Sequence, residues 1–221
     1  MKSSSLIDYS NLISRDAFFY FHLNKESKNI RYIADGINFS PSFLAIPEQV
    51  HSSNVNIIYK PGVYNNTDGL ITTVPNILLC LQVADCVPIY LYAVRSRMIG
   101  LVHAGWRGIV NGIVQNTIEK MLFLGADLKE IKIYLGPSIG KCCYEVDDDV
   151  ATYFNIKSKL KDGKWKVGIR EQIIFFLLEL GIIKKNIRKS SICTFESKKY
   201  HSYRRDGAKS GRLLGFAGID K

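Results

Sequence analysis

Three nearly continuous apolar runs in the middle of the chain constrain its fold most strongly. They cover residues 76–83 (NILLCLQV), 87–94 (VPIYLYAV) and 97–103 (RMIGLVH). A half-exposed strand alternates apolar and polar side chains, whereas a strand covered on both faces is apolar throughout. The three runs therefore predict strands in a sheet that other elements cover on both sides.

The segments around these runs alternate between strand-like and helix-like patterns. Strands are expected in four more segments, at residues 29–39, 53–60, 130–136 and 190–195, and the apolar residues 213–219 close the chain. Helical spacing or an acidic first turn predicts helices over residues 109–124, 145–154 and 170–180, and Gly125 and Gly181 end the first and last of these. No Pro/Gly/Ser-rich linker divides the 221 residues, so we expect one α/β domain.

The composition is that of a globular protein, with 47% hydrophobic residues and a mean hydropathy of +0.01. The longest apolar stretch, IIFFLLELGII, is interrupted by Glu179 and Gly181, so it is interpreted as a buried helix. The first residues lack the apolar centre of a signal peptide, and the cysteine count of five is odd. We therefore expect a cytoplasmic protein without a disulfide framework.

Basic residues are concentrated near the C-terminal end. The net charge is +10, and residues 184–212 contain ten Lys and Arg against only Glu196 and Asp206. Such a bias attracts phosphate groups, on a small substrate or on nucleic acid. A solvated basic face is the alternative interpretation.

Three residues of metal-binding types stand next to predicted strands. His51 precedes one strand, and Cys86 and His103 lie at the ends of apolar runs. If they converge at one sheet edge, two imidazoles and a thiolate can bind zinc and leave a fourth position open, as in catalytic zinc sites. The spacing has no CxxC or HxxxH pair, so each residue can equally be part of an ordinary core.

Two glycine-framed segments follow predicted strands. In VHAGWRG a tight turn leads into a helix whose N-terminal amides favour an anion, and Arg107 can add a charge-assisted partner; a plain corner with Trp106 packed beneath it is the alternative. In GPSIGKCCYEV the adjacent Cys142 and Cys143 are expected to point in different directions, so that at least one lies in the core. Further on, YHSYRRDGAKSGR could form a phosphate clamp, a nucleic-acid surface or a salt-bridged hairpin.

Six motifs occur together in order: QVH, DGLIT, ADCVPI, VHAGWRG, GPSIGKCCYEV and SYRRDGAKSGR. On these motifs the chain resembles the laccase-domain (YfiH-type) family over residues 48–218; its members are labelled polyphenol oxidase, peptidoglycan editing factor or purine nucleoside phosphorylase. The resemblance implies one α/β domain over residues 1–221, with mixed β-sheets sandwiched by helices. It also implies that the family's zinc ligands, the histidine of QVH, the cysteine of ADC and the histidine of HAGW, are His51, Cys86 and His103 here.

The chain departs from the family pattern in three places. Residues 12–24, LISRDAFFYFHLN, replace a glycine-containing STRxGGVS segment that helps to line the family's pocket. His201 stands where an aromatic residue is expected, and Ser52 replaces the common glycine after QVH.

The activity implied by the resemblance is phosphorolysis of adenosine, inosine and S-methyl-5'-thioadenosine, with adenosine deamination as a side activity. Purine nucleosides and phosphate would be its partners, and zinc with an open position would activate a water for attack at C6 of adenine. Candidates for holding the phosphate are Arg107, Arg204 and Arg205. Asp85 and Glu145 are candidates for proton transfer.

A count of histidines bears on the laccase label. A multicopper oxidase needs a blue-copper centre and a trinuclear cluster, and four histidines cannot build both. Copper can nevertheless replace zinc in a single His₂Cys site. Two rivals remain: a nucleic-acid-binding protein that uses the basic segment, which we disfavour, and a cysteine hydrolase of peptidoglycan precursors with Cys86 as nucleophile and His103 as base.

Overall fold

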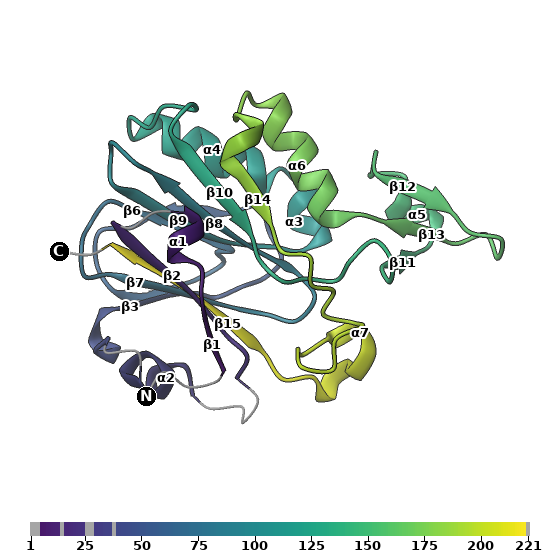
Figure 1. Ribbon diagram of the computed structural model, residues 1–221, viewed down its shortest axis with the longest axis horizontal. Coiled ribbons are helices and arrows are strands. Elements are labelled where there is room, and N and C mark those ends of the chain that lie inside the picture. Colours follow the sequence, from purple (N-terminus) through teal and green to yellow (C-terminus); the bar gives the residue numbers. More distant parts are fainter. Residues whose placement is uncertain (1–4, 14–15, 25–28, 37–38, 220–221) are drawn as a thin grey trace.

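The computed structural model describes residues 5–13, 16–24, 29–36 and 39–219 (Figure 1). Two six-stranded sheets pack face to face, and helices cover the outer face of each. The chain is thus one mixed α/β domain, as predicted. Within the described residues, none of the helices is both long and apolar enough to cross a bilayer.

The first sheet is built around the C-terminal strand β15 (Leu213–Ile219). β15 pairs antiparallel with β2 (Ala17–His22) and with β7 (Leu78–Val83), and β7 pairs parallel with β3 (Leu44–Pro47). The short strands β1 (Leu6–Asp8) and β5 (Gly62–Tyr64) form its edges.

The second sheet is built around the antiparallel pair β8 (Val87–Ala93) and β9 (Met98–Ala104). β10 (Ile131–Leu135) and β14 (Ile187–Lys189) extend it beyond β8, and β6 (Gly69–Thr72) and β4 (Val55–Ile57) extend it beyond β9. The register pairs Pro88 with His103, which brings Cys86, just before β8, to the end of β9.

The space between the sheets is filled by aliphatic side chains together with a group of aromatic ones. Phe19 from β2 contacts Tyr90 and Tyr92 from β8, and all three are fully buried. The Tyr90 hydroxyl donates to the Tyr20 carbonyl at 3.0 Å, so one hydrogen bond also joins the two sheets.

Helices complete the outer layers. α3 (Trp106–Val110), α4 (Ile113–Phe123) and α6 (Ile169–Glu179) cover the second sheet, and α2 (Ile30–Gly36) covers the first (Figure 1). A three-stranded sheet projects from the body, with strands β11 (Glu145–Val146), β13 (Trp165–Val167) and β12 (Lys157–Lys159). The short helices are α1 (Ser10–Ile13), α5 (Asp148–Ala151) and α7 (Tyr203–Asp206), with 3-10 turns at Pro41–Phe43, Lys184–Asn186 and Gly207–Lys209.

Most predicted elements are confirmed, and four need correction. Residues 29–39 were predicted as a strand but contain α2, because Ile30, Ile33 and Ala34 share one helical face toward the first sheet. Residues 190–195 form only an isolated bridge at Cys193.

Glu145 lies in β11 and does not begin a helix, since α5 starts at Asp148. The helix over 109–124 is divided at Gly112, whose φ of 91° interrupts it, whereas Gly125 and Gly181 end their helices as predicted.

Of the atypical N-terminal segment, Ser14 and Arg15 lie outside the described residues.

Candidate functional site

Three residues from separate parts of the chain meet at one end of the two sheets. His51 lies in the turn after β3, Cys86 lies between β7 and β8, and His103 is in β9. One donor atom from each lies within 4.8 Å of the others, and the two imidazole rings stand nearly perpendicular, with their centroids 4.8 Å apart. Tetrahedral zinc, with bonds of roughly 2.0–2.3 Å, separates its ligand atoms by about 3.3–3.8 Å, so this donor set fits the ion.

Asp68, which the site prediction missed, orients two of these three residues. It is fully buried, and its Oδ1 lies 2.7 Å from His103 Nδ1. Its carboxylate also accepts the backbone N–H groups of Val50, His51 and Ser52 and the Ser52 hydroxyl. A carboxylate on Nδ1 leaves Nε2 of His103 for a metal, as in many zinc sites. Asp68 begins the DGLIT motif, which was the signal for it in the sequence.

Ionisation of Cys86 and His103 is coupled. Burial opposes charge on both side chains, but the opposite charge and hydrogen bond of each partner outweigh it. The pKa of Cys86 is therefore lowered and that of His103 is raised, where Asp68 also contributes. Without a metal, the pair favours a thiolate beside an imidazolium.

Two residues of the site hold a left-handed backbone. His51 has a φ of 62° and Asp85 a φ of 79°. This conformation costs a residue with a Cβ of order 1 kcal/mol and persists only where surrounding contacts enforce it. Asp68 supplies those contacts at His51, and at Asp85 they come from the C-terminal segment described below.

Gly105 explains why the HAGW motif needs a glycine. A Cβ at this position would lie 3.0 Å from His51 Cδ2 and 3.1 Å from Cys86 Sγ. A Cβ at Gly108 would lie 2.7 Å from the Ser52 carbonyl oxygen, so α3 approaches the His51 turn equally closely. Both glycines allow the start of α3 to lie close to the segments that carry His51 and Cys86, in agreement with the tight turn that the sequence predicts.

The three residues line a pocket of about 790 Å³, which is a typical size for a small-molecule site. His51 is exposed, Cys86 is half-buried and His103 is buried, so the cluster is open on one side. Aromatic and basic side chains form the rest of the wall, including Trp106, Tyr144, Tyr203, Arg107, Arg204 and Arg212. Tyr144 was not expected in the site, and Arg212 belongs to the segment that the sequence offered as a possible phosphate clamp. Burial raises the pKa of Tyr144 to about 12, so its hydroxyl is protonated at neutral pH.

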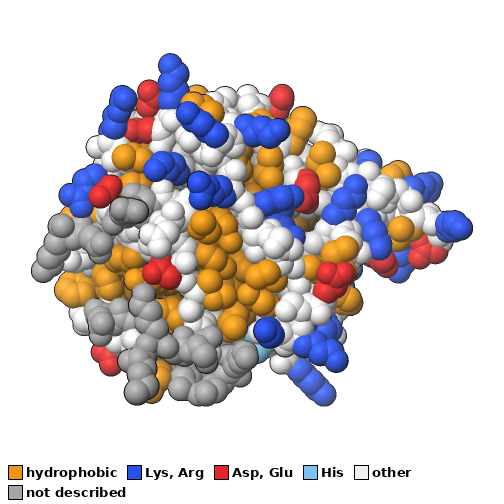
Figure 2. Space-filling view, in the orientation of Figure 1, with side chains coloured by type: hydrophobic (Ala, Val, Ile, Leu, Met, Phe, Trp, Pro, Cys, Tyr) orange, Lys and Arg blue, Asp and Glu red, His pale blue; other side chains and the backbone are white. Residues whose placement is uncertain are grey.

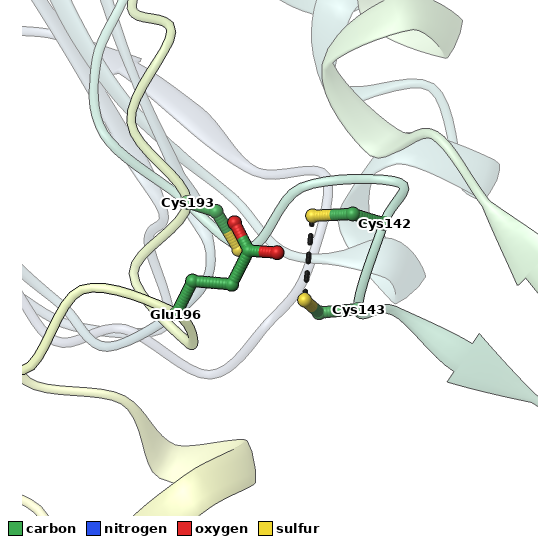
Figure 3. A group of neighbouring side chains, drawn as sticks. All are labelled: Cys142, Cys143, Cys193 and Glu196. Carbon is green, nitrogen blue, oxygen red and sulfur yellow. Dashed lines mark hydrogen bonds between the residues drawn. The ribbon is translucent and has the colours of Figure 1, made fainter.

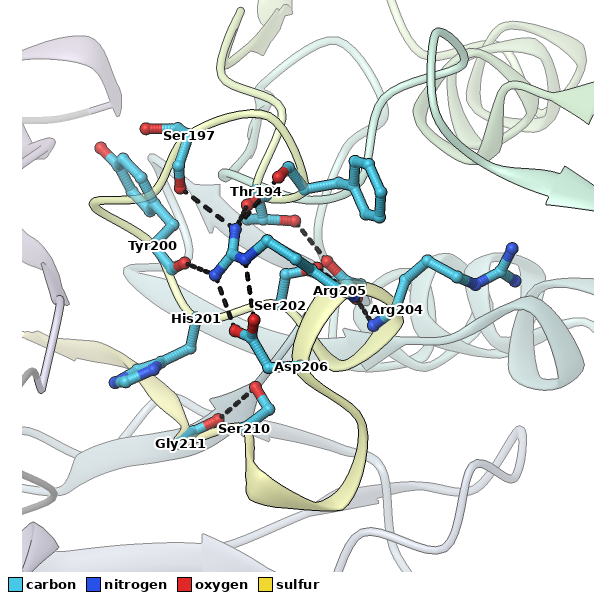
Figure 4. A network of polar contacts seen from close by, with 12 residues as sticks. Thr194, Ser197, Tyr200, His201, Ser202, Arg204, Arg205, Asp206, Ser210 and Gly211 are labelled. Carbon is cyan, nitrogen blue, oxygen red and sulfur yellow. Dashed lines mark hydrogen bonds and ion pairs between the residues drawn. The ribbon is translucent and has the colours of Figure 1, made fainter.

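Two of the three predicted phosphate-binding arginines reach the pocket. The Arg107 guanidinium lies 4.4 Å from the centre of the Trp106 ring, and that of Arg204 lies 5.0 Å from the centre of the Tyr144 ring. Arg205 lies elsewhere: it donates to four backbone carbonyls of residues 194–200 and pairs with Asp206 (Figure 4). Arg204 therefore lines the pocket, whereas Arg205 lies inside the loop, so the two do not form the expected pair at the pocket.

Asp85 is an anchor for the C-terminal segment. Its Oδ1 accepts from the Thr194 hydroxyl at 2.6 Å, and its Oδ2 accepts from the Ser202 hydroxyl and from the Arg204 backbone N–H. It is 8% exposed. Glu145 lies outside the pocket lining, and its carboxylate is 3.7 Å from Lys166 Nζ. Both carboxylates thus have protein partners.

Comparison with known proteins agrees with this geometry. A family model described as multi-copper polyphenol oxidoreductase laccase matches residues 24–220. The chain is 33% identical to a purine nucleoside phosphorylase of Corynebacterium glutamicum, covering 88% of this chain and 82% of that protein. It is 29% identical to the purine nucleoside phosphorylase YlmD of Bacillus subtilis, covering 87% and 76%.

Solved structures show the same fold. The hypothetical protein YfiH of Bacillus licheniformis superposes with a TM-score of 0.89 at 25% identity, covering 99% of this chain and 98% of that one. YlmD of Geobacillus stearothermophilus gives 0.87 at 26% identity, covering 94% and 93%. With its motifs, its fold and a family match over nearly its whole length, the chain belongs to the laccase-like (YfiH-type) family, which the family model describes as multi-copper polyphenol oxidoreductase laccase.

Proposed function

We propose that the protein is a zinc-dependent purine nucleoside phosphorylase acting on adenosine, inosine and S-methyl-5'-thioadenosine, with adenosine deamination as a side activity. One observation carries the proposal: His51, Cys86 and His103 converge at the wall of a pocket that also holds aromatic and basic side chains. The names of the relatives in Corynebacterium and Bacillus support the same reaction class.

His51, Cys86 and His103 would hold the zinc, with Asp68 fixing His103 from behind. A zinc ion with three protein ligands supplies a Lewis acid at an open position, where it can polarise a purine nitrogen or a water molecule. In this proposal Trp106, Tyr144 and Tyr203 bind the flat faces of the purine and ribose.

Phosphorolysis requires an anion beside the sugar. A phosphate oxygen forms a bond to C1′ of the ribose while the bond from C1′ to the purine nitrogen breaks, and the base leaves with the electron pair and takes up a proton. Arg107 and Arg204, both at the pocket, would bind the phosphate through charge-assisted hydrogen bonds. Arg212 lines the same pocket and adds positive charge. Arg205 would hold the loop that carries Arg204.

The carboxylate contacts refine the two candidates for proton transfer. Both oxygens of Asp85 accept hydrogen bonds from the segment around Arg204, which favours a positioning role. Glu145 pairs with Lys166, while its carbonyl accepts from the Arg204 guanidinium. In this proposal both residues hold Arg204 in place, and the departing base takes its proton from water or from the Tyr144 hydroxyl.

The test is product analysis with purified protein. With phosphate present, adenosine should yield adenine and ribose 1-phosphate, and inosine should yield hypoxanthine; without phosphate, base release should stop. Inosine formed from adenosine in the absence of phosphate would report the deaminase activity separately. Base release that does not depend on phosphate would identify a hydrolase and overturn the proposal.

One observation favours a second candidate, the cysteine hydrolase. Cys86, His103 and Asp68 form a hydrogen-bonded series in the order of a nucleophile, a base and an orienting carboxylate. In metal-free protein at pH 7, Cys86 should react with iodoacetamide much faster than Cys80, because the pKa of Cys86 is lowered whereas burial raises that of Cys80. Bound zinc should protect Cys86; a Cys86 that stays reactive in protein purified with its metal would support the hydrolase.

The other two alternatives are less well supported. His22 and His201 lie outside the cluster of His51 and His103, so the described residues offer one His₂Cys group and not a multicopper centre. Lys and Arg side chains on the face shown in Figure 2 are interspersed with acidic and apolar ones and form no continuous stripe, which weakens the nucleic-acid hypothesis.

A further inference from the structure

Three cysteines and a glutamate gather at a second place, outside the pocket lining (Figure 3). Cys142 and Cys143 lie in the connection from β10 to β11, and Cys193 and Glu196 lie in the segment after β14. The sequence predicted that the two adjacent cysteines point apart and that one is a core residue. Instead, their sulfur atoms are 3.3 Å apart, and neither side chain is buried.

We propose that Cys142, Cys143, Cys193 and Glu196 form a second zinc site, with three thiolates and one carboxylate as ligands. It is separate from the His51–Cys86–His103 site and does not depend on the proposed activity. Four protein ligands close the coordination shell, which is the arrangement of a structural rather than a catalytic zinc.

The donor atoms have the spacing that zinc needs. One ligand atom from each of the four residues lies within 4.8 Å of the other three. Thiolates on a tetrahedral zinc, with Zn–S bonds of about 2.3 Å, lie roughly 3.8 Å apart. The separation of 3.3 Å between Cys142 and Cys143 is close to that value, so small side-chain rotations suffice.

The surroundings suit a negatively charged cluster. The Gly140 backbone N–H donates to Cys193 Sγ at 3.2 Å, an interaction that favours the thiolate. A Cβ at Gly140 would lie 3.0 Å from Cys142 Sγ, so glycine leaves room for the sulfur atoms. The buried guanidinium of Arg170 donates to the carbonyl of Ile192, next to Cys193, and places a positive charge nearby.

The position of the cluster explains what a metal would do there. The β10–β11 connection carries Tyr144 into the pocket, and the segment after Cys193 carries Thr194 to Asp85 and Arg204 to the pocket wall. Protein contacts already join the two segments, through a bridge between Ser138 and Cys193 and the Thr194 N–H to Ser138 bond. Zinc would cross-link them at a third point and fix two walls of the pocket.

The test counts metal in the full chain and identifies its ligands. Protein loaded with zinc should hold two ions per chain, and Cys86→Ser and Cys143→Ser should each hold one. With cobalt(II) in place of zinc, Cys86→Ser should keep a strong near-ultraviolet thiolate-to-metal absorption, and the double variant should lose it. Cys80→Ala, which changes a cysteine buried elsewhere, is the matched control and should keep both ions.

Two results would overturn the proposal. One is the absence of thiolate absorption in cobalt-loaded Cys86→Ser whose circular dichroism matches that of the unchanged protein. The other is an intact mass, after purification under reductant, that is lighter by two hydrogen atoms and shifts back in Cys143→Ser; this would show a disulfide in place of a metal site. Glu196→Gln, which retains all three thiols, should keep the absorption but weaken zinc binding at least tenfold.

Discussion

At the scale of single residues, the candidate site depends on groups that bind no substrate. Asp68 accepts four hydrogen bonds from residues 50–52 and contacts His103, so one buried carboxylate positions two of the proposed metal ligands. Gly105 leaves the space in which His51 and Cys86 approach each other. The site therefore depends on Asp68 and Gly105 as well as on the three residues that would bind the metal.

Replacing Asp68 tests the first of these dependencies. Asp68→Asn keeps the shape of the side chain but removes the charge that opposes His103, and loss of such an outer partner typically costs 10–100-fold in metal affinity. We expect zinc affinity, measured by competition with a chelator, to fall by about that factor. Asp147→Asn removes an exposed carboxylate elsewhere and should leave the affinity unchanged.

Gly105→Ala tests whether the site needs the space that Gly105 leaves beside His51 and Cys86. The backbone at Gly105, with a φ of −80°, accepts alanine, but the added methyl group would meet His51 and Cys86. Zinc binding should weaken at least as much as in Asp68→Asn, whereas far-UV circular dichroism should stay the same. The control is Gly36→Ala, where no atom of the described residues beyond its own helix and chain neighbours lies within 4 Å of the added Cβ. Unchanged zinc affinity in Gly105→Ala would show that the ligands lie farther apart than we describe.

At the scale of elements, neighbouring arginines in α7 have different tasks. Arg204 faces the pocket, and Arg205 ties the preceding loop together through its carbonyls (Figure 4). Arg204→Ala should raise KM for phosphate about tenfold, a loss of ~1.4 kcal/mol, with little change in Tm.

Arg205→Ala should mainly lower the stability of the protein, whereas Arg204→Ala should mainly raise KM for phosphate. Removal of its charge-assisted hydrogen bonds should lower the free energy of unfolding by about 1.5–3 kcal/mol, visible in thermal unfolding and in faster proteolysis of residues 194–200. Equal effects of the two variants on Tm and on KM would contradict this division of roles.

The sequence predicted strands most reliably where both faces of the strand are buried. β7, β8 and β9 are almost entirely apolar because both faces are covered, apart from the exposed Gln82 and the site residue His103, and this pattern identified them directly. Residues 29–39 were wrongly predicted as a strand because the segment is rich in β-branched residues. Ile30, Ile33 and Ala34 nevertheless follow a helical period. The sequence placed His51, Cys86 and His103 at strand ends, but Asp68, Tyr144 and the separation of Arg204 from Arg205 depend on long-range packing.

At the scale of the whole molecule, two sheets enclose one apolar core and carry the site at one end. Tyr90 belongs to the second sheet and donates to a carbonyl of the first. Tyr90→Phe keeps the ring and removes this hydrogen bond between the sheets, so the free energy of unfolding should fall by about 0.5–1.5 kcal/mol. Urea unfolding should show a lower midpoint with an unchanged m-value. Tyr59→Phe, at a side chain 64% exposed, should change neither.

Phosphorolysis by this protein, as proposed above, depends on metal at His51, Cys86 and His103. Its most direct test is to measure zinc content and phosphate-dependent release of adenine from adenosine, side by side, in the unchanged protein and in folded Cys86→Ser. We expect the variant to bind one zinc ion fewer per chain and to lose adenine release with it. Adenine release that persists in Cys86→Ser, with its circular dichroism intact and that zinc missing, would contradict the central claim.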